Sequence, residues 1–539
     1  MRRVLQAASV LLSAIVWLQP PAVLPLPSRT GADGPPRPFG AEPPAGHEPA
    51  NTSPSFVREQ NRALLYGPFP KGGLARGVSD GDLMLSDSAE IRMQTMDRTR
   101  ALGGSVARIP VDWRNVVQAS PPPGFQARDP ASPAYNFSRL DAAVESAVSA
   151  GLQPLLVVSH APSFAEAPHR WPDAYPGSWA PSPIALEEFA TAVAQRYSGA
   201  FPDPLHRGAV LPRVRFLQAW NEPNLARYLE PQWVAVGRRW SAFSPLLYRQ
   251  LLNGFYAGVK SVQPSDTVIA AGIAPEGERA GVGAMAPVTF LEGLLCLGAE
   301  SANCLQKPHL DALAFHPLSV FDPDIPAVSK LDVAVSDIGK LTELLARAER
   351  EHTVLPAGPR PLWVTELNWE SSPPTSKGVP NRLQAAWIAR ALHRLWVSGV
   401  SFVDWHFLID PYGGALLASP NGSLNRYPRP AGLYYAGPNG NTALARPKPF
   451  LRGFTLPFDP LRVNARQVRV WALLMRGGQQ AVLQLAGHGG RWHTLARLRA
   501  DSYGVLNRLL PLKGFASLRL RAGTLLSAQA TVPSTRNTL

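Results

Sequence analysis

Eight short apolar runs, separated by longer amphipathic stretches, constrain the fold of this 539-residue chain more than any other feature. Parallel strands that are buried on both faces read as continuous apolar runs, because helices cover one face and core side chains cover the other. Repeated alternation of strand and helix therefore indicates an α/β protein with a parallel sheet. The runs span 74–78, 105–111, 153–159, 213–220, 267–273, 310–315, 362–367 and 402–407.

Six of the intervening stretches predict amphipathic helices, at 88–102, 138–150, 184–197, 245–262, 333–350 and 382–397. Eight strand–helix alternations predict a closed (β/α)₈ TIM barrel. A doubly wound open sheet is the competing architecture, but it normally carries a glycine-rich phosphate turn after its first strand. The sequence ARGVSDGD at 75–82 supplies no such turn, so we favour the barrel.

The pattern of apolar and polar residues changes after about residue 446. Short, partly alternating segments separated by Gly-rich turns predict a small antiparallel β-sandwich. We therefore place the barrel at 56–445 and an accessory domain at 446–539. The segments of the accessory domain lie at 467–474, 480–485, 494–499 and 517–522.

The accessory domain carries nearly all of the net charge. Residues 446–539 contain 15 Lys/Arg and 2 Asp/Glu, against a net charge of +14 for the whole chain. Such a domain is suited to contact an anionic glycan or a cell surface. The alternative is an arginine-rich surface without a ligand. Nucleic acid is not expected as a partner, because no recognition motif accompanies the charge.

The N-terminus has the shape of a signal peptide. Arg2 and Arg3 precede an apolar run at 4–18, and Pro20 and Pro21 follow it. The run is short for a membrane span. We assign 1–30 to a signal peptide and 31–55 to a Pro/Gly-rich linker, which predicts a secreted or extracytoplasmic protein. An uncleaved anchor is the alternative, since no clean A-x-A cleavage site follows.

Cys296 and Cys304 are the only cysteines. In an exported protein they predict a local disulfide, with two unpaired buried thiols as the alternative. Two thiols without clustered histidines do not predict a metal site, and we expect no cofactor.

Polar side chains close several of the apolar runs. Active-site groups of (β/α)₈ barrels lie at the C-terminal ends of the strands, so these side chains are candidates for one shared site. In chain order they are Arg108 in the second run, His160 after the third, Asn221 and Glu222 after the fourth, His316 after the sixth, Glu366 in the seventh and Trp405 in the eighth.

Glu222 and Glu366 form the natural catalytic pair, because strands four and seven face each other across a barrel rim. Hydrolysis of a glycosidic bond needs one protonated carboxyl group and one ionised carboxylate. Arg108 would keep Glu366 ionised, since a nearby cation lowers the pKa of a carboxyl group. Asn221 would hold the 2-hydroxyl of the sugar.

Three motifs resemble those of clan A glycoside hydrolases. WNEPN at 220–224 resembles their acid/base motif, WVTELNW at 363–369 their nucleophile motif, and RIPVDW at 108–113 the second-strand motif of family 5. The resemblance is closest to family 39-like and family 5-like members and covers about residues 74–445. It implies Glu222 as acid/base, Glu366 as nucleophile, and substrate-binding roles for Arg108, Asn221, His316 and Trp405, with Trp405 as the aromatic floor of the sugar site.

These observations predict a secreted retaining glycosidase acting on an oligosaccharide or polysaccharide. A non-catalytic carbohydrate-binding or wall-associated barrel and a transglycosylase are the alternatives. Individual residues also have structural alternatives: an ion pair for Arg108, satisfied core histidines for His160 and His316, and barrel packing for Trp405.

Overall fold

The structure, a computed structural model, describes residues 54–298, 304–412, 416–418, 424–426 and 430–534. The assigned signal peptide and nearly all of the assigned linker lie outside these residues. Among the described residues, no helix is long and apolar enough to span a membrane.

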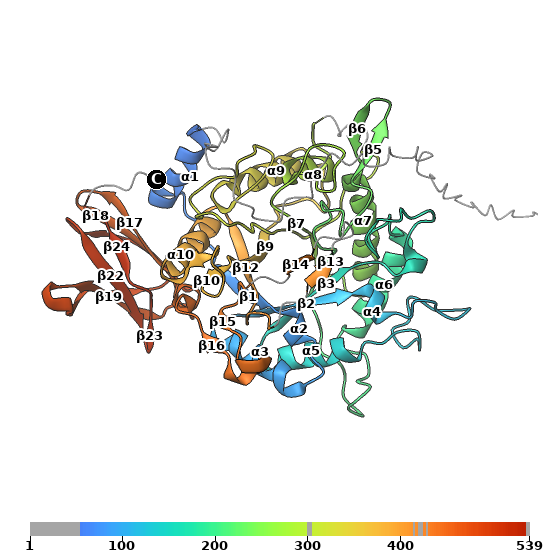
Figure 1. The fold of residues 1–539 in the computed structure, drawn as a ribbon, viewed down its shortest axis with the longest axis horizontal. Helices are drawn as coiled ribbons and strands as arrows, with labels where there is room; N and C mark the ends of the chain where they lie inside the picture. Colours follow the sequence, from blue (N-terminus) through green and yellow to red (C-terminus); the bar gives the residue numbers. More distant parts are fainter. Residues whose placement is uncertain (1–53, 299–303, 413–415, 419–423, 427–429, 535–539) are drawn as a thin grey trace, which may run out of the picture.

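Eight parallel strands close into a barrel in the order β1-β12-β9-β8-β7-β4-β3-β2, which confirms the predicted fold class (Figure 1). Each predicted apolar run contains one barrel strand, with ends that differ by a few residues at most. The strands are β1 (Ala75–Ser79), β2 (Val106–Asp112), β3 (Gln153–Ser159), β4 (Phe216–Ala219), β7 (Thr267–Ile273), β8 (Ala312–Phe315), β9 (Leu362–Leu367) and β12 (Val400–His406).

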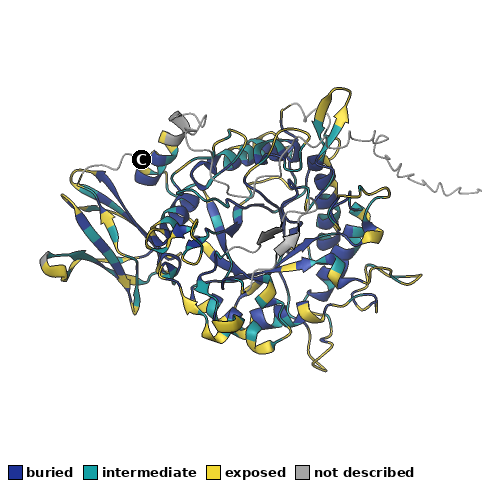
Figure 2. Cartoon of the chain, in the orientation of Figure 1, coloured by how far each residue is buried: buried dark blue, intermediate teal, exposed yellow. Residues whose placement is uncertain are grey.

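Helices surround the barrel, and Figure 2 shows their outer faces exposed while the strands are buried. Local capping explains two of the starting points. The Ser88 side chain accepts a hydrogen bond from the Ile91 backbone N–H, and Ser182 precedes a helix with proline at its first position. The six predicted helices are α3 (Ala89–Ala101), α5 (Ser138–Ser149), α6 (Pro183–Arg196), α7 (Ser244–Val262), α9 (Gly339–Arg350) and α10 (Asn381–Val397).

The lower part of the barrel lumen is apolar and the upper part is polar. Side chains that include Val106, Leu155, Ile269 and Phe402 form a separate buried cluster inside the barrel. Because successive strand residues point to opposite sides, Arg108 and Asp404 continue the inward-facing rows of Val106 and Phe402. The polar layer therefore sits toward the C-terminal ends of the strands, on a packed apolar floor.

The structure contains further elements that were not among the sequence predictions. They include helix α1 (Pro54–Tyr66), helix α8 (Pro287–Leu294), and a hairpin of β5 (Trp233–Val236) and β6 (Arg239–Ala242). Leu64 and Leu65 of α1 pack on Leu461 and Val463, which lie almost 400 residues later in the chain. Tertiary contacts of this kind, rather than local pattern, hold α1 in place.

The C-terminal region forms two antiparallel sheets that share one apolar core, as predicted for a sandwich. All four predicted segments are strands, whereas β17, β21, β23 and β24 were not predicted. One sheet contains β17 (Phe458–Asn464), β18 (Gln467–Leu473) and β21 (Val505–Pro511). The other contains β20 (Trp492–Arg499), β19 (Gln480–Ala486), β22 (Ala516–Ala522), β23 (Leu525–Leu526) and β24 (Ala530–Val532).

A buried charge network joins this domain to the barrel. Asp459 of β17 accepts hydrogen bonds from Arg390 Nε at 2.9 Å and His393 Nδ1 at 2.7 Å, both on α10. The guanidinium groups of Arg390 and Arg394 also bind Asp324. The ring of Trp471 stacks on His393 with centroids 4.8 Å apart. The accessory domain is therefore anchored on a barrel helix by paired charges and packed rings.

A disulfide joins Cys296 and Cys304, which confirms the predicted pairing.

Helices α6 and α7 pack so closely that a side chain at Gly258 would clash. A Cβ there would lie 2.4 Å from the Glu187 carbonyl oxygen and 3.1 Å from the Ala190 Cβ. We expect Gly258→Ala to lower the free energy of unfolding by about 1–3 kcal/mol through overpacking. Urea denaturation measures this. Gly72→Ala is the matched control, because a Cβ at Gly72 meets nothing within 4 Å; equal effects of the two substitutions would contradict the close packing.

Candidate active site

The two candidate glutamates meet at the C-terminal rim of the barrel. Glu222 and Glu366 are both buried, with 7% of each residue exposed. One carboxylate oxygen of each, together with a ring nitrogen of His316, lies in a group whose atoms are all within 4.8 Å of one another. The folded chain thus brings together residues that are 144 positions apart in sequence.

A bulge in β9 turns Glu366 into the lumen. Val364 pairs with Val403 and Leu367 pairs with Trp405, so Thr365 and Glu366 both lie opposite the single residue Asp404. An extra residue of this kind breaks the regular alternation of side chains. As a result, Thr365 and Glu366 both reach polar partners inside the barrel, although they are adjacent in sequence.

A tight turn after β4 positions Glu222. Trp220 and Glu222 have positive φ angles of 70° and 40°, which non-glycine residues adopt rarely and at a cost in strain. The Trp220 ring is fully buried and its Nε1–H donates to the Tyr228 carbonyl oxygen at 2.8 Å. The Glu222 N–H donates to the Gly272 carbonyl oxygen at 3.0 Å. These contacts hold the strained turn in one conformation.

Arg108 links the two strand ends. Its Nη1 lies 2.9 Å from Glu366 Oε1, and its Nη2 donates to Asn221 Oδ1 at 2.8 Å. Only 4% of Arg108 is exposed. Charge-assisted hydrogen bonds of this kind are strong where water is excluded. The predicted proximity of Arg108, Asn221 and Glu366 is therefore present.

The electrostatics of the site keep Glu366 ionised. Burial alone would raise the pKa of its carboxyl group, but the charges of His316, His406 and Arg108 and the hydrogen bond from Arg108 outweigh burial and lower the pKa to about 2. Burial lowers the pKa of His406 to about 4, so that imidazole is neutral at pH 7. Arg108 contributes both a charge and a direct hydrogen bond to Glu366.

His316 contacts both glutamates from the end of β8. Its Nδ1 lies 3.0 Å from Glu222 Oε1 and 3.8 Å from Glu366 Oε2, and its Nε2 lies 3.0 Å from the Thr365 hydroxyl. In one tautomer Nδ1–H donates to an ionised Glu222; in the other, a protonated Glu222 donates to Nδ1 and Nε2–H donates to Thr365. His316 can therefore partner Glu222 in either protonation state.

Glu222, His316 and Glu366 are also close enough to share a metal ion. The donor set argues against that use. Arg108 already places a positive charge 2.9 Å from Glu366, and both nitrogens of His316 have hydrogen-bond partners. A dication would compete with all of these contacts, so we assign the cluster to proton and carboxylate chemistry.

Trp405 does not take the position that was predicted for it. Trp405 lies between the inward-facing Asp404 and His406, so strand alternation turns its ring outward. The ring is fully buried near Trp369, Phe450 and Phe454, and its Nε1–H donates to the Ala431 carbonyl oxygen at 3.0 Å. Trp405 is therefore a packing residue in this structure, and the expected aromatic floor is not formed by its ring.

His160 lies at the edge of the site. Its ring centroid is 5.2 Å from that of Tyr228, and burial lowers the pKa of His160 to about 4. Tyr228 contacts the Asn221 side chain, and burial raises the pKa of Tyr228 to about 12. The described contacts thus connect His160 to the glutamates through Tyr228.

The structure adds residues that the sequence reasoning did not select. His406 accompanies Glu366 from β12, with its Nδ1 2.8 Å from the Ser79 hydroxyl. Tyr228 follows WNEPN by four positions, in a loop without a readable pattern. His406 was recognised in the sequence as one of the polar residues of the eighth run, but Trp405 was selected in its place; His406 follows Asp404 by two positions and so shares its face of the strand.

Asp404 is fully buried below the two glutamates and has no hydrogen-bond partner for either carboxyl oxygen within the described residues. The neighbouring Ser79 hydroxyl lies 2.8 Å from His406 Nδ1, and its interaction with Asp404 lowers the pKa of that carboxyl group. Burial raises the pKa of Asp404 well above its usual range, against the opposing effect of Arg108. The environment of this layer therefore shifts the pKa values of its two carboxyl groups in opposite directions, downward for Glu366 and upward for Asp404.

Fold and site together define a (β/α)₈-barrel protein with a paired-carboxylate site at the C-terminal rim. No protein-family profile and no curated protein matches the chain. The solved structures that resemble the chain include clan A glycoside hydrolases, among them members of both families that the motifs resemble.

Three of these structures illustrate the range. A family 39 glycoside hydrolase from Bacteroides cellulosilyticus WH2 is 17% identical, with 82% of this chain and 81% of that chain covered and a TM-score of 0.47. A glucosidase from Croceicoccus marinus is 13% identical over 82% and 95%, with a TM-score of 0.46. A GH5_18 from Bifidobacterium longum subsp. infantis is 15% identical over 71% and 78%, with a TM-score of 0.42. Likenesses at this level carry no assignment of activity to this chain.

Asp404→Asn tests the neutral state of the buried carboxyl group. Because the folded pKa lies above the ordinary value of 3.8, the wild type loses stability as pH rises above about 4, by about 1 kcal/mol per pH unit until the folded pKa is reached. Asparagine does not titrate, so the stability of Asp404→Asn relative to wild type should increase from pH 5 to pH 8. Urea denaturation at both pH values measures this difference.

Asp97→Asn, an exposed substitution on α3, is the control and should show no such trend. A stability difference between Asp404→Asn and wild type that stays constant from pH 5 to pH 8 would mean that Asp404 is ionised in the folded protein.

Proposed function

We propose that this chain is a retaining glycoside hydrolase that cleaves O-glycosidic bonds by double displacement. The single observation that carries the proposal is the approach of Glu222 and Glu366 oxygens to within 4.8 Å. Retaining enzymes hold their two carboxyl groups about 5–5.5 Å apart, whereas inverting enzymes need a wider gap for a water molecule. The separation here suits direct attack by a carboxylate.

In the first step, an ionised Glu366 oxygen would bond to the anomeric carbon as the bond to the leaving oxygen breaks. Glu222 would give its proton to that oxygen. Arg108 supports this division of roles, because it pairs with Glu366 and keeps the nucleophile ionised. In the second step, water would attack the anomeric carbon, Glu222 would take its proton, and Glu366 would leave.

Asn221 is suited to hold the 2-hydroxyl of the sugar. Its Oδ1 accepts from Arg108 and its amide contacts Tyr228, so its orientation is fixed from two sides. Of the two amide N–H donors, Tyr228 needs only one. The second amide N–H of Asn221 can then donate to the 2-hydroxyl of the sugar. A hydrogen bond to this hydroxyl strengthens in the transition state.

We also propose that the protein is exported. The residues predicted to form the signal peptide lie outside the described residues. The disulfide between Cys296 and Cys304 is compatible with an oxidising compartment.

Substitution of each glutamate tests the mechanism on a panel of aryl arabinosides, xylosides, glucosides and galactosides. Glu366→Ala should show no measurable turnover, because no nucleophile remains. Glu222→Ala should slow substrates with poor leaving groups by about 10²–10⁴-fold and affect activated aryl glycosides far less. Glu343→Ala, an exposed substitution on α9, is the control.

Unchanged turnover in Glu366→Ala would contradict the proposal. A fluorinated sugar that forms a covalent intermediate should label Glu366, which mass spectrometry locates. Products formed with an added acceptor alcohol separate hydrolysis from transglycosylation.

Arg108→Met tests the electrostatic support of the nucleophile. In the wild type, Glu366 stays ionised down to about pH 2. Without the guanidinium, one charge and one hydrogen bond that lower the pKa of Glu366 are lost while burial still raises it, so the acidic limb of kcat/KM should move to higher pH. The pH profile of kcat/KM measures the shift. Arg128→Met, half exposed and paired with Glu187, should leave the limb in place; an unshifted limb in Arg108→Met would contradict this role.

A further inference from the structure

One face of the accessory domain presents arginines without acidic neighbours. In the sheet of β20, β19 and β22, alternate residues point away from the apolar core that the two sheets share. Arg497, Arg499 and Arg521 on this face are exposed, and Arg519 is half-buried. We call this set, with Gln480, Val482, Gln484 and Trp492, the basic face.

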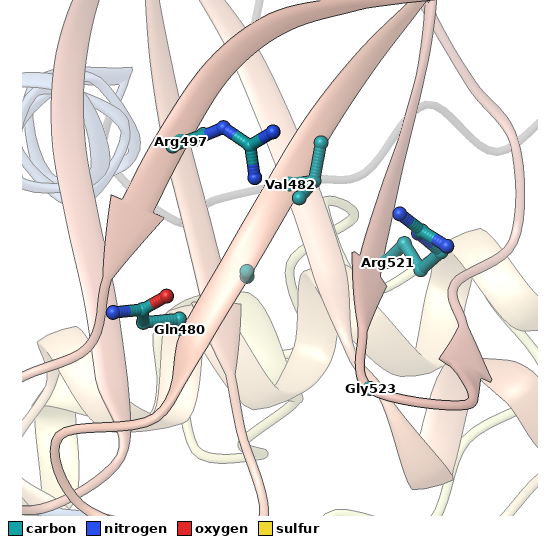
Figure 3. Close-up of a pocket in the computed structure, with 6 residues that line it drawn as sticks. Gln480, Val482, Arg497, Arg521 and Gly523 are labelled. Carbon is teal, nitrogen blue, oxygen red and sulfur yellow. The ribbon is translucent and has the colours of Figure 1, made fainter.

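The strand register gathers the basic face around β19. Val482 pairs with Arg497 on one side and Arg521 on the other, so two guanidinium groups flank one small apolar side chain. Figure 3 shows this arrangement, with Gln480 farther along the same strand. These residues line a hollow of about 300 Å³ that opens to solvent, together with Ala481 and Gly523.

Neighbouring contacts hold part of the basic face in place. The Arg519 guanidinium lies 4.1 Å from the centroid of the Trp492 ring, and its Nε–H donates to Gln484 Oε1 at 2.8 Å. The Arg499 Nε–H donates to the Gly478 carbonyl oxygen at 2.9 Å. Two of the four guanidinium groups are therefore oriented before any ligand arrives.

No carboxylate neutralises this charge. Residues 446–539 contain only two acidic residues. Asp459 is buried against Arg390 and His393, and Asp501 accepts backbone N–H groups of its own turn. Among the described residues, none of the four arginines of the basic face forms a salt bridge. The charge is thus available to a partner.

We infer that the basic face binds an anionic polysaccharide through carboxylate or sulfate groups. Arginine presents a planar array of donors that matches these oxyanions. Between the arginines lie the amides of Gln480 and Gln484, which can hydrogen-bond to sugar hydroxyl groups, and the small apolar side chain of Val482. Membrane insertion would call for exposed aromatic or long aliphatic side chains, and single-stranded nucleic acid for free stacking rings, whereas Trp492 is already covered by Arg519.

The full-length chain with Arg497→Gln and Arg521→Gln together tests this inference. The probes are dextran sulfate, polygalacturonate and neutral dextran. Wild type should bind at least one of the two polyanions and not neutral dextran, and the double variant should bind about tenfold more weakly. The sulfated and carboxylated probes distinguish the two acidic groups. Affinity electrophoresis measures the binding.

Arg508→Gln with Lys513→Gln is the matched control, because it removes the same charge from exposed positions in and after β21 of the other sheet. It should change the affinity by less than about twofold. If both double variants weakened polyanion binding equally, the effect would come from net charge alone and the inference would be wrong. The inference would also be wrong if the wild type bound neither polyanion. Tighter binding to phosphatidylglycerol vesicles or to a single-stranded oligonucleotide would also overturn it.

This inference does not depend on the proposed hydrolysis. Turnover of an aryl glycoside by both double variants should equal that of wild type, since neither touches the barrel rim. A wild-type chain that binds polyanions but cleaves no glycoside would overturn the hydrolase while leaving the basic face intact.

Discussion

The ion pair between Arg108 and Glu366 organises the upper half of the barrel. Two charges removed from water are costly unless good geometry and further hydrogen bonds compensate them. Asn221 occupies the second arm of the guanidinium, and His316 approaches the second oxygen of Glu366. Burial raises the pKa of Asp404, which lies close to the same pair. The lumen thus holds a balanced set of charges on an apolar floor, which is why the ionised carboxylate can remain in a site so poorly exposed to solvent.

Two local departures from regular backbone place the glutamates against this ion pair. The bulge in β9 directs Thr365 and Glu366 to the same side of the strand, and the positive φ angles of Trp220 and Glu222 fold the end of β4 over Gly272. A Cβ at Gly272 would lie 2.7 Å from Gln218 Nε2 and 2.8 Å from His316 Nε2, so the position needs glycine on steric grounds as well as for its φ of +86°. Strain, bulge and glycine together create the short distance between the carboxylates, which regular strands would not provide.

Much of the fold could be predicted from the sequence, because buried parallel strands appear as apolar runs that can be recognised in a single sequence. The proximity of Glu222 and Glu366 could also be predicted, because both end such runs within recognisable motifs. The orientation of Trp405 could not be predicted from the motif; it depends on which alternate residues face the lumen, and that register is fixed by the pairing of β12 with β9. Tyr228 and α1 were missed for a different reason, since loop geometry and contacts with distant residues such as Leu461 place them. The bulge at Thr365 has no local sequence signal at all.

The network around Asp459 bears on how far the two domains can be regarded as separate. It docks the accessory domain on α10, the helix that connects the strand carrying Glu366 with the strand carrying His406. Trp471, Leu473 and Val505 of the accessory domain belong to the same continuous apolar cluster as the barrel's own core. A chain cut at residue 445 would expose this cluster to solvent. Arg390 would also lose its ion pair with Asp459, and Arg390 and Arg394 would then share the carboxylate of Asp324. The barrel is therefore not an autonomous module, and any fusion or truncation meant to isolate its chemistry has to carry both halves.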